Sequence, residues 1–83
     1  MMFINKGKDG RNNLCGKTIA LLRKEQGISQ RVLADRMQLL GLDIDKNAVQ
    51  RIEAGQRFVT DIELLLFSDY FGVPADRLLR DCD

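Results

Sequence analysis

Apolar residues recur at every third or fourth position between Leu14 and Leu79, which is the spacing of amphipathic helices. No window alternates apolar and polar residues in the manner of a strand. Glycines and helix-capping residues divide this stretch into five predicted helices, at about 13–26, 29–40, 45–54, 60–71 and 74–79. The pattern therefore predicts an all-α chain with short connections, folded as a compact bundle.

The predicted helix starts carry side chains that satisfy free backbone N–H groups. Asn13, Ser29 and Asp45 are expected as the N-caps of the first three helices. Thr60 and Glu63 have the spacing of a capping box at the start of the fourth helix, where each side chain accepts from the backbone of the other residue. The starts of these four helices are thus predicted from residues close in sequence.

The fourth helix differs from the others because it is apolar around more of its circumference. Its apolar residues span an arc of roughly 200°, about twice the width of one core-facing stripe. Part of this helix is therefore expected to pack on a second copy of the chain. Cover by the fifth helix of the same chain is the alternative.

Residues 1–12 are polar and rich in Gly, Asn and Lys. Short polar ends of this kind are commonly left unpacked, so we expect a flexible N-terminal arm at 1–12. The chain length suits one domain, expected at 13–83.

The composition limits the chemistry of the chain, which has 83 residues, two widely separated cysteines and no histidine. The usual general base and zinc ligands are missing, so no enzyme, metal site or cofactor is expected. No apolar run approaches the ~20 residues of a membrane span, and the start lacks the apolar core of a signal peptide. A cytoplasmic protein with no membrane partner is expected.

The net charge of only +1 hides an uneven distribution. Residues 1–57 hold eleven Lys and Arg against six Asp and Glu, a net of +5, whereas residues 58–83 hold two against six, a net of −4. A basic half and an acidic half are consistent with one face that meets phosphates and another that does not.

Several stretches of the chain resemble the family of the phage Cro and CI repressors and the Xre-type regulators. They are IALLRKEQG, ISQRVLADRM, NAVQRIEAGQR and TDIELLLFSDYFGVPADRLL, which follow the family's order over residues 16–80. The resemblance implies a lambda-repressor-like five-helix fold in which the second and third predicted helices form a helix-turn-helix motif. It also implies double-stranded DNA as the partner, and transcriptional regulation, usually repression, as the function.

The link between the two motif helices departs from the family pattern. Between Ser29 and Ile52 the chain is about five residues longer than the usual motif, and the excess falls in QLLGLDID. We expect the second helix to continue through Leu40, after which Leu42 and Ile44 return the link to the core. The extension leaves the angle between the two motif helices open.

The third predicted helix has the features of a recognition helix, whose N-terminal part enters the major groove. With Asp45 as cap, Val49 and Ile52 face inward and four long polar side chains share the exposed face. The resemblance assigns base contacts to these four, Lys46, Asn47, Gln50 and Arg51. Their chemistry suits guanine and adenine edges, although an ordinary solvated helix face carries similar residues.

Further roles follow from the resemblance. Phosphate contacts, which set affinity without reading sequence, are assigned to Gln30, Arg31, Gln56 and Arg57. Arg23 and Glu53 are expected to form a partly buried ion pair between the first and third helices, with separate solvation of the two as the alternative.

The resulting hypothesis is a sequence-specific DNA-binding regulator that acts as a homodimer, with Leu66, Phe67 and Tyr70 at the dimer interface. Two alternatives stay open. One is an antitoxin-like protein that binds a toxin and represses its own promoter, and the other is a protein-interaction module that has lost DNA binding. A partner protein, a toxin or an antirepressor, belongs to these alternatives.

Overall fold

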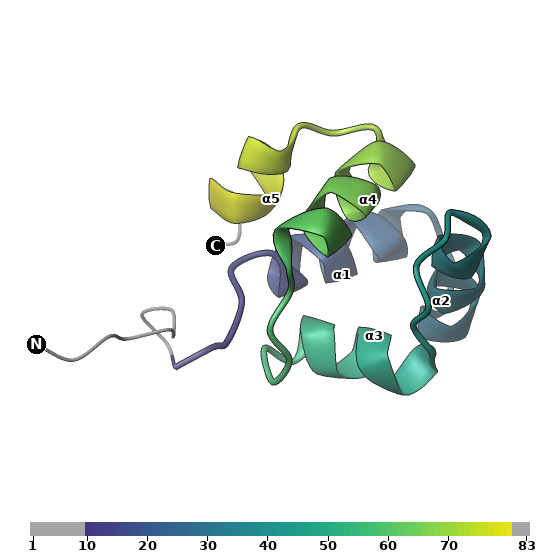
Figure 1. The fold of residues 1–83 in the computed structure, drawn as a ribbon, viewed down its shortest axis with the longest axis horizontal. Coiled ribbons are helices and arrows are strands. Elements are labelled where there is room, and N and C mark those ends of the chain that lie inside the picture. Colours follow the sequence, from purple (N-terminus) through teal and green to yellow (C-terminus); the bar gives the residue numbers. More distant parts are fainter. Residues whose placement is uncertain (1–9, 81–83) are drawn as a thin grey trace, which may run out of the picture.

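The computed structural model describes residues 10–80, which contain five helices and no strand (Figure 1). The helices are α1 (Gly16–Glu25), α2 (Gln30–Leu39), α3 (Lys46–Glu53), α4 (Asp61–Phe71) and α5 (Ala75–Arg80). The predicted all-α fold of five helices is confirmed. Residues 1–9, which make up most of the expected arm, and residues 81–83 lie outside the described range.

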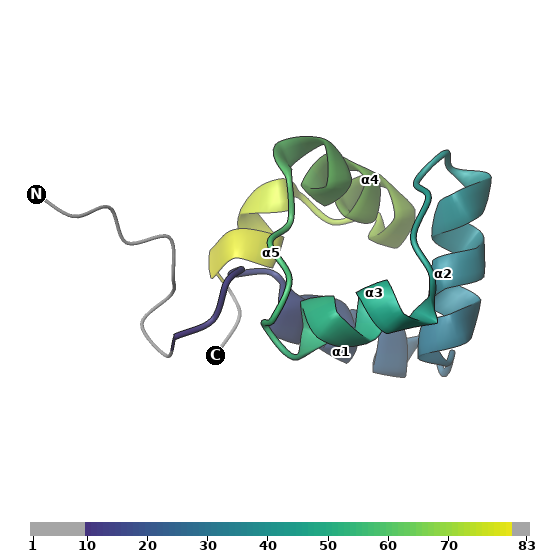
Figure 2. The ribbon, with the colours of Figure 1, turned by 60° about the horizontal axis from the view of Figure 1, so that its bottom comes forward.

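The bundle places α3 on the side opposite α4 and α5, with α1 between them (Figure 1). α1 packs against both α3 and α5, and α2 packs against α3 and α4. The turned view of Figure 2 brings α3 forward, and no other helix lies in front of it. Within residues 10–80, no helix is long and apolar enough to cross a membrane.

Three helix starts have the predicted caps. The Ser29 hydroxyl accepts from the backbone N–H three residues ahead at 3.1 Å, and the Asp45 carboxylate does so at 2.8 Å. The Thr60–Glu63 capping box is complete at the start of α4. Each of these caps satisfies backbone groups that a helix start leaves open, and each sets the register of its helix.

The first helix starts later than predicted. Its N-cap is Cys15, whose side chain makes no capping hydrogen bond. Asn13 instead reaches forward from the preceding turn, and its Oδ1 accepts from the backbone N–H of Gly16 at 2.8 Å. The expected capping function is present, although Asn13 does not occupy the cap position.

The core contains apolar residues from all five helices and from the link between α2 and α3. Its buried members are Cys15, Ile19, Leu22, Leu33, Ala34, Met37, Ile44, Val49, Ile52, Phe67 and Leu78. The second helix was expected to continue through Leu40, but α2 ends at Leu39. Leu40 is its C-cap, and the Leu40 side chain is exposed.

The extended link returns to the core as expected. Ile44 is only 3% exposed, and Leu42 packs at the edge of the core. The Gln38 side-chain amide donates to the Ile44 carbonyl at 2.7 Å, which ties the link back to the last turn of α2. The longer link is therefore a packed part of the fold.

Two residues assigned to the arm make specific contacts with the folded part of the chain. The backbone N–H of Asn12 donates to the Gly55 carbonyl at 2.8 Å, and Arg11 Nη2 donates to the Glu53 carbonyl at 2.6 Å. The hydrogen-bonded structure thus begins no later than Arg11.

Candidate nucleic-acid interface

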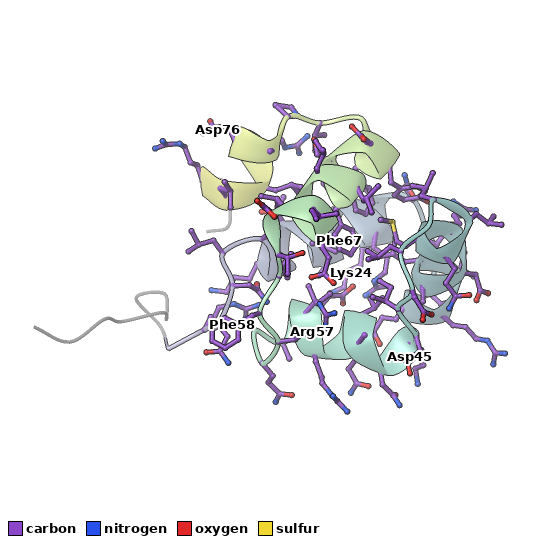
Figure 3. The ribbon with its side chains drawn as sticks, in the orientation of Figure 1. Lys24, Asp45, Arg57, Phe58, Phe67 and Asp76 are labelled. Atoms are coloured by element: carbon purple, nitrogen blue, oxygen red, sulfur yellow. The ribbon has the colours of Figure 1, made fainter. Side chains whose placement is uncertain are left out.

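The exposed face of α3 is polar along its whole length. Val49 and Ile52 are buried against the core, while the side chains on the opposite face are exposed, namely Lys46, Asn47, Gln50 and Arg51. Figure 3 shows long side chains leaving the edge of α3 that faces away from α4 and α5, with Asp45 at the start of the helix. The Asp45 cap therefore sets the register that turns these four side chains outward.

A shallow depression of about 260 Å³ lies on this face. It is lined by Asn47, Gln50, Arg51, Ala54 and Gln56. Four of the five were predicted as DNA-contacting residues, and the structure brings them together. Ala54 was not predicted, although its position, three residues after Arg51 and seven after Asn47, places it on the same helical face. Lys46 does not line the depression.

An ion pair joins α1 to the end of α3. Arg23 Nε donates to Glu53 Oε2 at 2.7 Å and Arg23 Nη2 to Glu53 Oε1 at 3.1 Å, and the two side chains are 12% and 8% exposed. Arg23 also donates to the Ile28 carbonyl at 2.8 Å, just before α2 begins. This is the pair that the family resemblance implied, and its fork-to-fork geometry fixes the separation of the two helices.

Gln30, expected to contact phosphate, also takes part in this network. Its Nε2 donates to Glu53 Oε1 at 3.0 Å, so the first residue of α2 is linked directly to the last residue of α3. Arg31, the next residue, is exposed. Gln30 therefore lies at the junction of the two helices, where one of its amide hydrogens is already bonded to Glu53.

Arg57 is engaged with α4 instead of with the α3 face. Its guanidinium forms two hydrogen bonds with the Glu63 carboxylate, at 3.0 and 2.9 Å. The pKa of Glu63 is lowered, chiefly by these hydrogen bonds, and the pKa of Arg57 is raised by the same contact. A phosphate contact by Arg57 would have to compete with Glu63, which sequence reasoning did not foresee.

Comparison with protein families gives a match to a model described as helix-turn-helix, over residues 19–78. The chain belongs to the helix-turn-helix family of Cro/CI and Xre-type regulators. This is a family of DNA-binding regulators, and the matched residues run from α1 into α5. The search of curated proteins and the search of solved structures found no match.

Within the helix-turn-helix unit, α2 is the first motif helix and α3 the second. The two pack directly on each other, and the link between them spans residues 40–45. The cap of α3 is formed within this link, by Asp45, while Ile44 anchors the link in the core. The longer link thus leaves the packing of α2 on α3 intact.

One expected dimer contact is wrong. Phe67 is 0% exposed and lies in the core, so it is unavailable to a second chain. Leu66 and Tyr70 are partly buried against the same core. The exposed apolar residues of α4 are instead Ile62, at 70%, and Leu65, at 58%.

Proposed function

We propose that this protein binds a specific double-stranded DNA sequence through α3 and represses transcription. The observation that supports this most directly is the shared depression on α3, where Asn47, Gln50 and Arg51 stand side by side and exposed. Amide and guanidinium groups in such a row match the donor and acceptor pattern of base edges in the major groove.

The rest of the helix-turn-helix unit supports phosphate contacts. α2 begins beside the end of α3, linked to it through Gln30 and Glu53, so groups at that helix start lie next to the recognition surface. Arg31, the second residue of α2, and Gln56, which lines the depression, are both exposed. Backbone N–H groups at a helix start and nearby cations favour an anion there.

A homodimer fits this proposal, since two helix-turn-helix units read a palindromic site whose half-sites are about 34 Å apart. The contact would then be made by α4, which belongs to the acidic half 58–83, leaving both copies of the basic half facing DNA. The apolar side chains of Ile62 and Leu65 on α4 are exposed and are therefore available for such a contact.

Selection of bound fragments from random duplex DNA tests the proposal. Arg51→Ala and Asn47→Ala should each weaken binding to the selected sequence by about 1–3 kcal/mol, because each removes a base contact, and leave binding to random DNA nearly unchanged. Gln30→Ala should weaken binding to all sequences.

Arg80→Ala is the matched control, because it removes an exposed positive charge from α5, on the other side of the bundle from α3. Its sequence preference should equal that of the wild type. If no sequence were enriched, or if the α3 variants kept the full preference, α3 would not be the recognition helix. Retained folding with no duplex affinity would favour the protein-interaction alternative.

A further inference from the structure

The C-terminal end of α3 is held by residues far away in sequence, the segment 11–13. Asn12 makes two of the contacts. Its backbone N–H donates to the Gly55 carbonyl at 2.8 Å, and its side-chain amide donates to the Gln56 carbonyl at 3.1 Å. Both acceptors belong to the loop that leaves α3 and carries one wall of the depression.

Asn13 ties the same loop to the start of α1. Its Nδ2 donates to the Ile52 carbonyl at 3.0 Å and to the Arg57 carbonyl at 2.8 Å, while its Oδ1 accepts from Gly16. Asn13 is buried, and all of its side-chain polar atoms are used. A methyl group on Gly16 would collide with the Ile52 carbonyl oxygen, so α1 and α3 meet here with no space between them.

Arg11 covers the point where the chain turns away from α3. Its Nη2 donates to the Glu53 carbonyl at 2.6 Å, and its side chain lies over Gly55, whose φ is +78°. A Cβ on Gly55 would come within 2.8 Å of the Arg11 side chain. The guanidinium thus lies at the negative end of the α3 dipole, where a cation is stabilising.

The two ends of α3 are therefore anchored by different parts of the chain. The start is set by the Asp45 cap and by packing on α2. The last carbonyls of the helix and the loop through Arg57 are held by segment 11–13, in place of water. Ala54 and Gln56, the two residues that line the depression beyond the end of the helix, belong to this second part.

We infer that segment 11–13 is a positioning element of the DNA-binding surface, which sets the end of α3 and the Gln56 wall without touching DNA itself. The inference rests on the proposed function. A binding surface discriminates between ligands only if the groups behind it hold it to a fraction of an ångström. Loss of segment 11–13 should therefore alter the reading of bases by the second half of α3 and spare the first half.

The test uses Asn12→Ala and Arg11→Ala in the full chain. Asn12 is only partly buried and carries no charge, so its truncation leaves the core and the electrostatics of DNA binding intact. Arg80→Ala controls for the lost charge in Arg11→Ala. Two quantities are measured, amide hydrogen exchange without DNA and the sequence preference among random duplexes.

The Gly55 and Gln56 amides, which bond to carbonyls in the last turns of α3, should exchange about tenfold faster in both variants, and the Val49 amide should not change. Affinity for the selected sequence should fall about tenfold, a loss comparable to that of one hydrogen bond. The sequence preference should weaken at the base pairs where Gln50→Ala also weakens it. At the base pairs where Lys46→Ala weakens the preference, it should stay as in the wild type. A general loss of stability would not produce this division.

The outcomes separate the two claims. Unchanged exchange at Gly55 and Gln56 would show that segment 11–13 does not hold the loop, and would overturn the inference while DNA binding stands. Faster exchange with an unchanged sequence preference would also overturn it. A wild-type protein that enriches no sequence would overturn the proposed function, and the inference with it.

Discussion

Glu53 links three elements through one carboxylate. It accepts two hydrogen bonds from Arg23 of α1 and one from Gln30 of α2, and it ends α3 itself. Because the Arg23 and Glu53 side chains are mostly removed from water, the ion pair is screened less than one on the surface. Loss of either partner leaves the other charge poorly solvated.

Glu53→Ala should lower the free energy of unfolding by about 3–5 kcal/mol, since it strands the Arg23 guanidinium and the Gln30 amide. Urea denaturation measures this directly. Asp76→Ala, which breaks the exposed ion pair to Arg80 on α5, is the matched control and should cost less than about 1 kcal/mol. Equal losses in the two variants would show that the Arg23–Glu53 pair behaves as a surface pair.

Glu63 makes stability depend on pH in the acidic range. The Arg57 hydrogen bonds lower its pKa below the ordinary value of 4.5, so the folded state binds a proton less readily than the unfolded state. The stabilisation is full above the unfolded pKa and is lost as pH falls through the lower folded pKa. Glu63→Gln should therefore show a shallower loss of stability below about pH 4.5 than the wild type.

Thermal melting between neutral and acidic pH checks this expectation. Asp69→Asn, which removes an exposed carboxylate from the same helix, serves as the comparison. If Glu63→Gln and the wild type lost stability in parallel as pH falls, Glu63 would not be the source of this pH dependence.

Glu63→Gln also weakens the hydrogen bonds that hold the Arg57 guanidinium, so it should raise affinity for DNA of any sequence if Arg57 reaches phosphate.

At the scale of elements, the link between α2 and α3 decides whether the motif keeps its geometry. Ile44 is 3% exposed and holds the link in the core, whereas Leu39, at the end of α2, is 87% exposed. Ile44→Ala should cost about 2–5 kcal/mol because it removes buried methyl groups and leaves a cavity.

Leu39→Ala is the matched comparison for this element, and we expect it to change stability by less than about 0.5 kcal/mol. Chemical denaturation of the two variants side by side provides the measurement. Similar stabilities for Ile44→Ala and the wild type would mean that the link is held by its hydrogen bonds, among them the one from Gln38 to the Ile44 carbonyl, and not by its packing.

At the scale of the whole molecule, the proposed dimer depends on which part of α4 remains uncovered. Ile62 and Leu65 are exposed, whereas Phe67 is in the core. Leu65→Glu should therefore shift the chain toward monomer and weaken binding to a palindromic site, because a charge replaces an apolar contact. Phe67→Glu should unfold the chain instead, since its carboxylate would be buried without a partner.

Sedimentation at micromolar concentration, with and without DNA, measures the change in association. Leu21→Glu is the matched control, because Leu21 of α1 is similarly exposed and lies outside the acidic half. A wild-type chain that is monomeric in both conditions would rule out the dimer. A Leu65→Glu variant that still dimerises would place the interface elsewhere.

The sequence by itself determined where most helices begin and which face of α3 is polar. Ser29, Asp45 and Thr60 cap their helices through hydrogen bonds to residues three positions ahead, so the information is local. Once Asp45 sets the register, the helical repeat alone turns Asn47, Gln50 and Arg51 to one side. The sequence predicted the ends of helices less well, since α2 was expected to continue through Leu40 and ends at Leu39.

Tertiary structure alone decided which apolar part of α4 is covered, and how the end of α3 is held. A wide apolar arc does not reveal which part meets the core, so Phe67 was misplaced although the helix itself was predicted. The bonds from Arg11 and Asn12 to the end of α3 span 42 and 44 positions, and no local pattern marks them. They form only because packing of α1 on α3 brings the two segments together, and such proximity is a property of the folded chain.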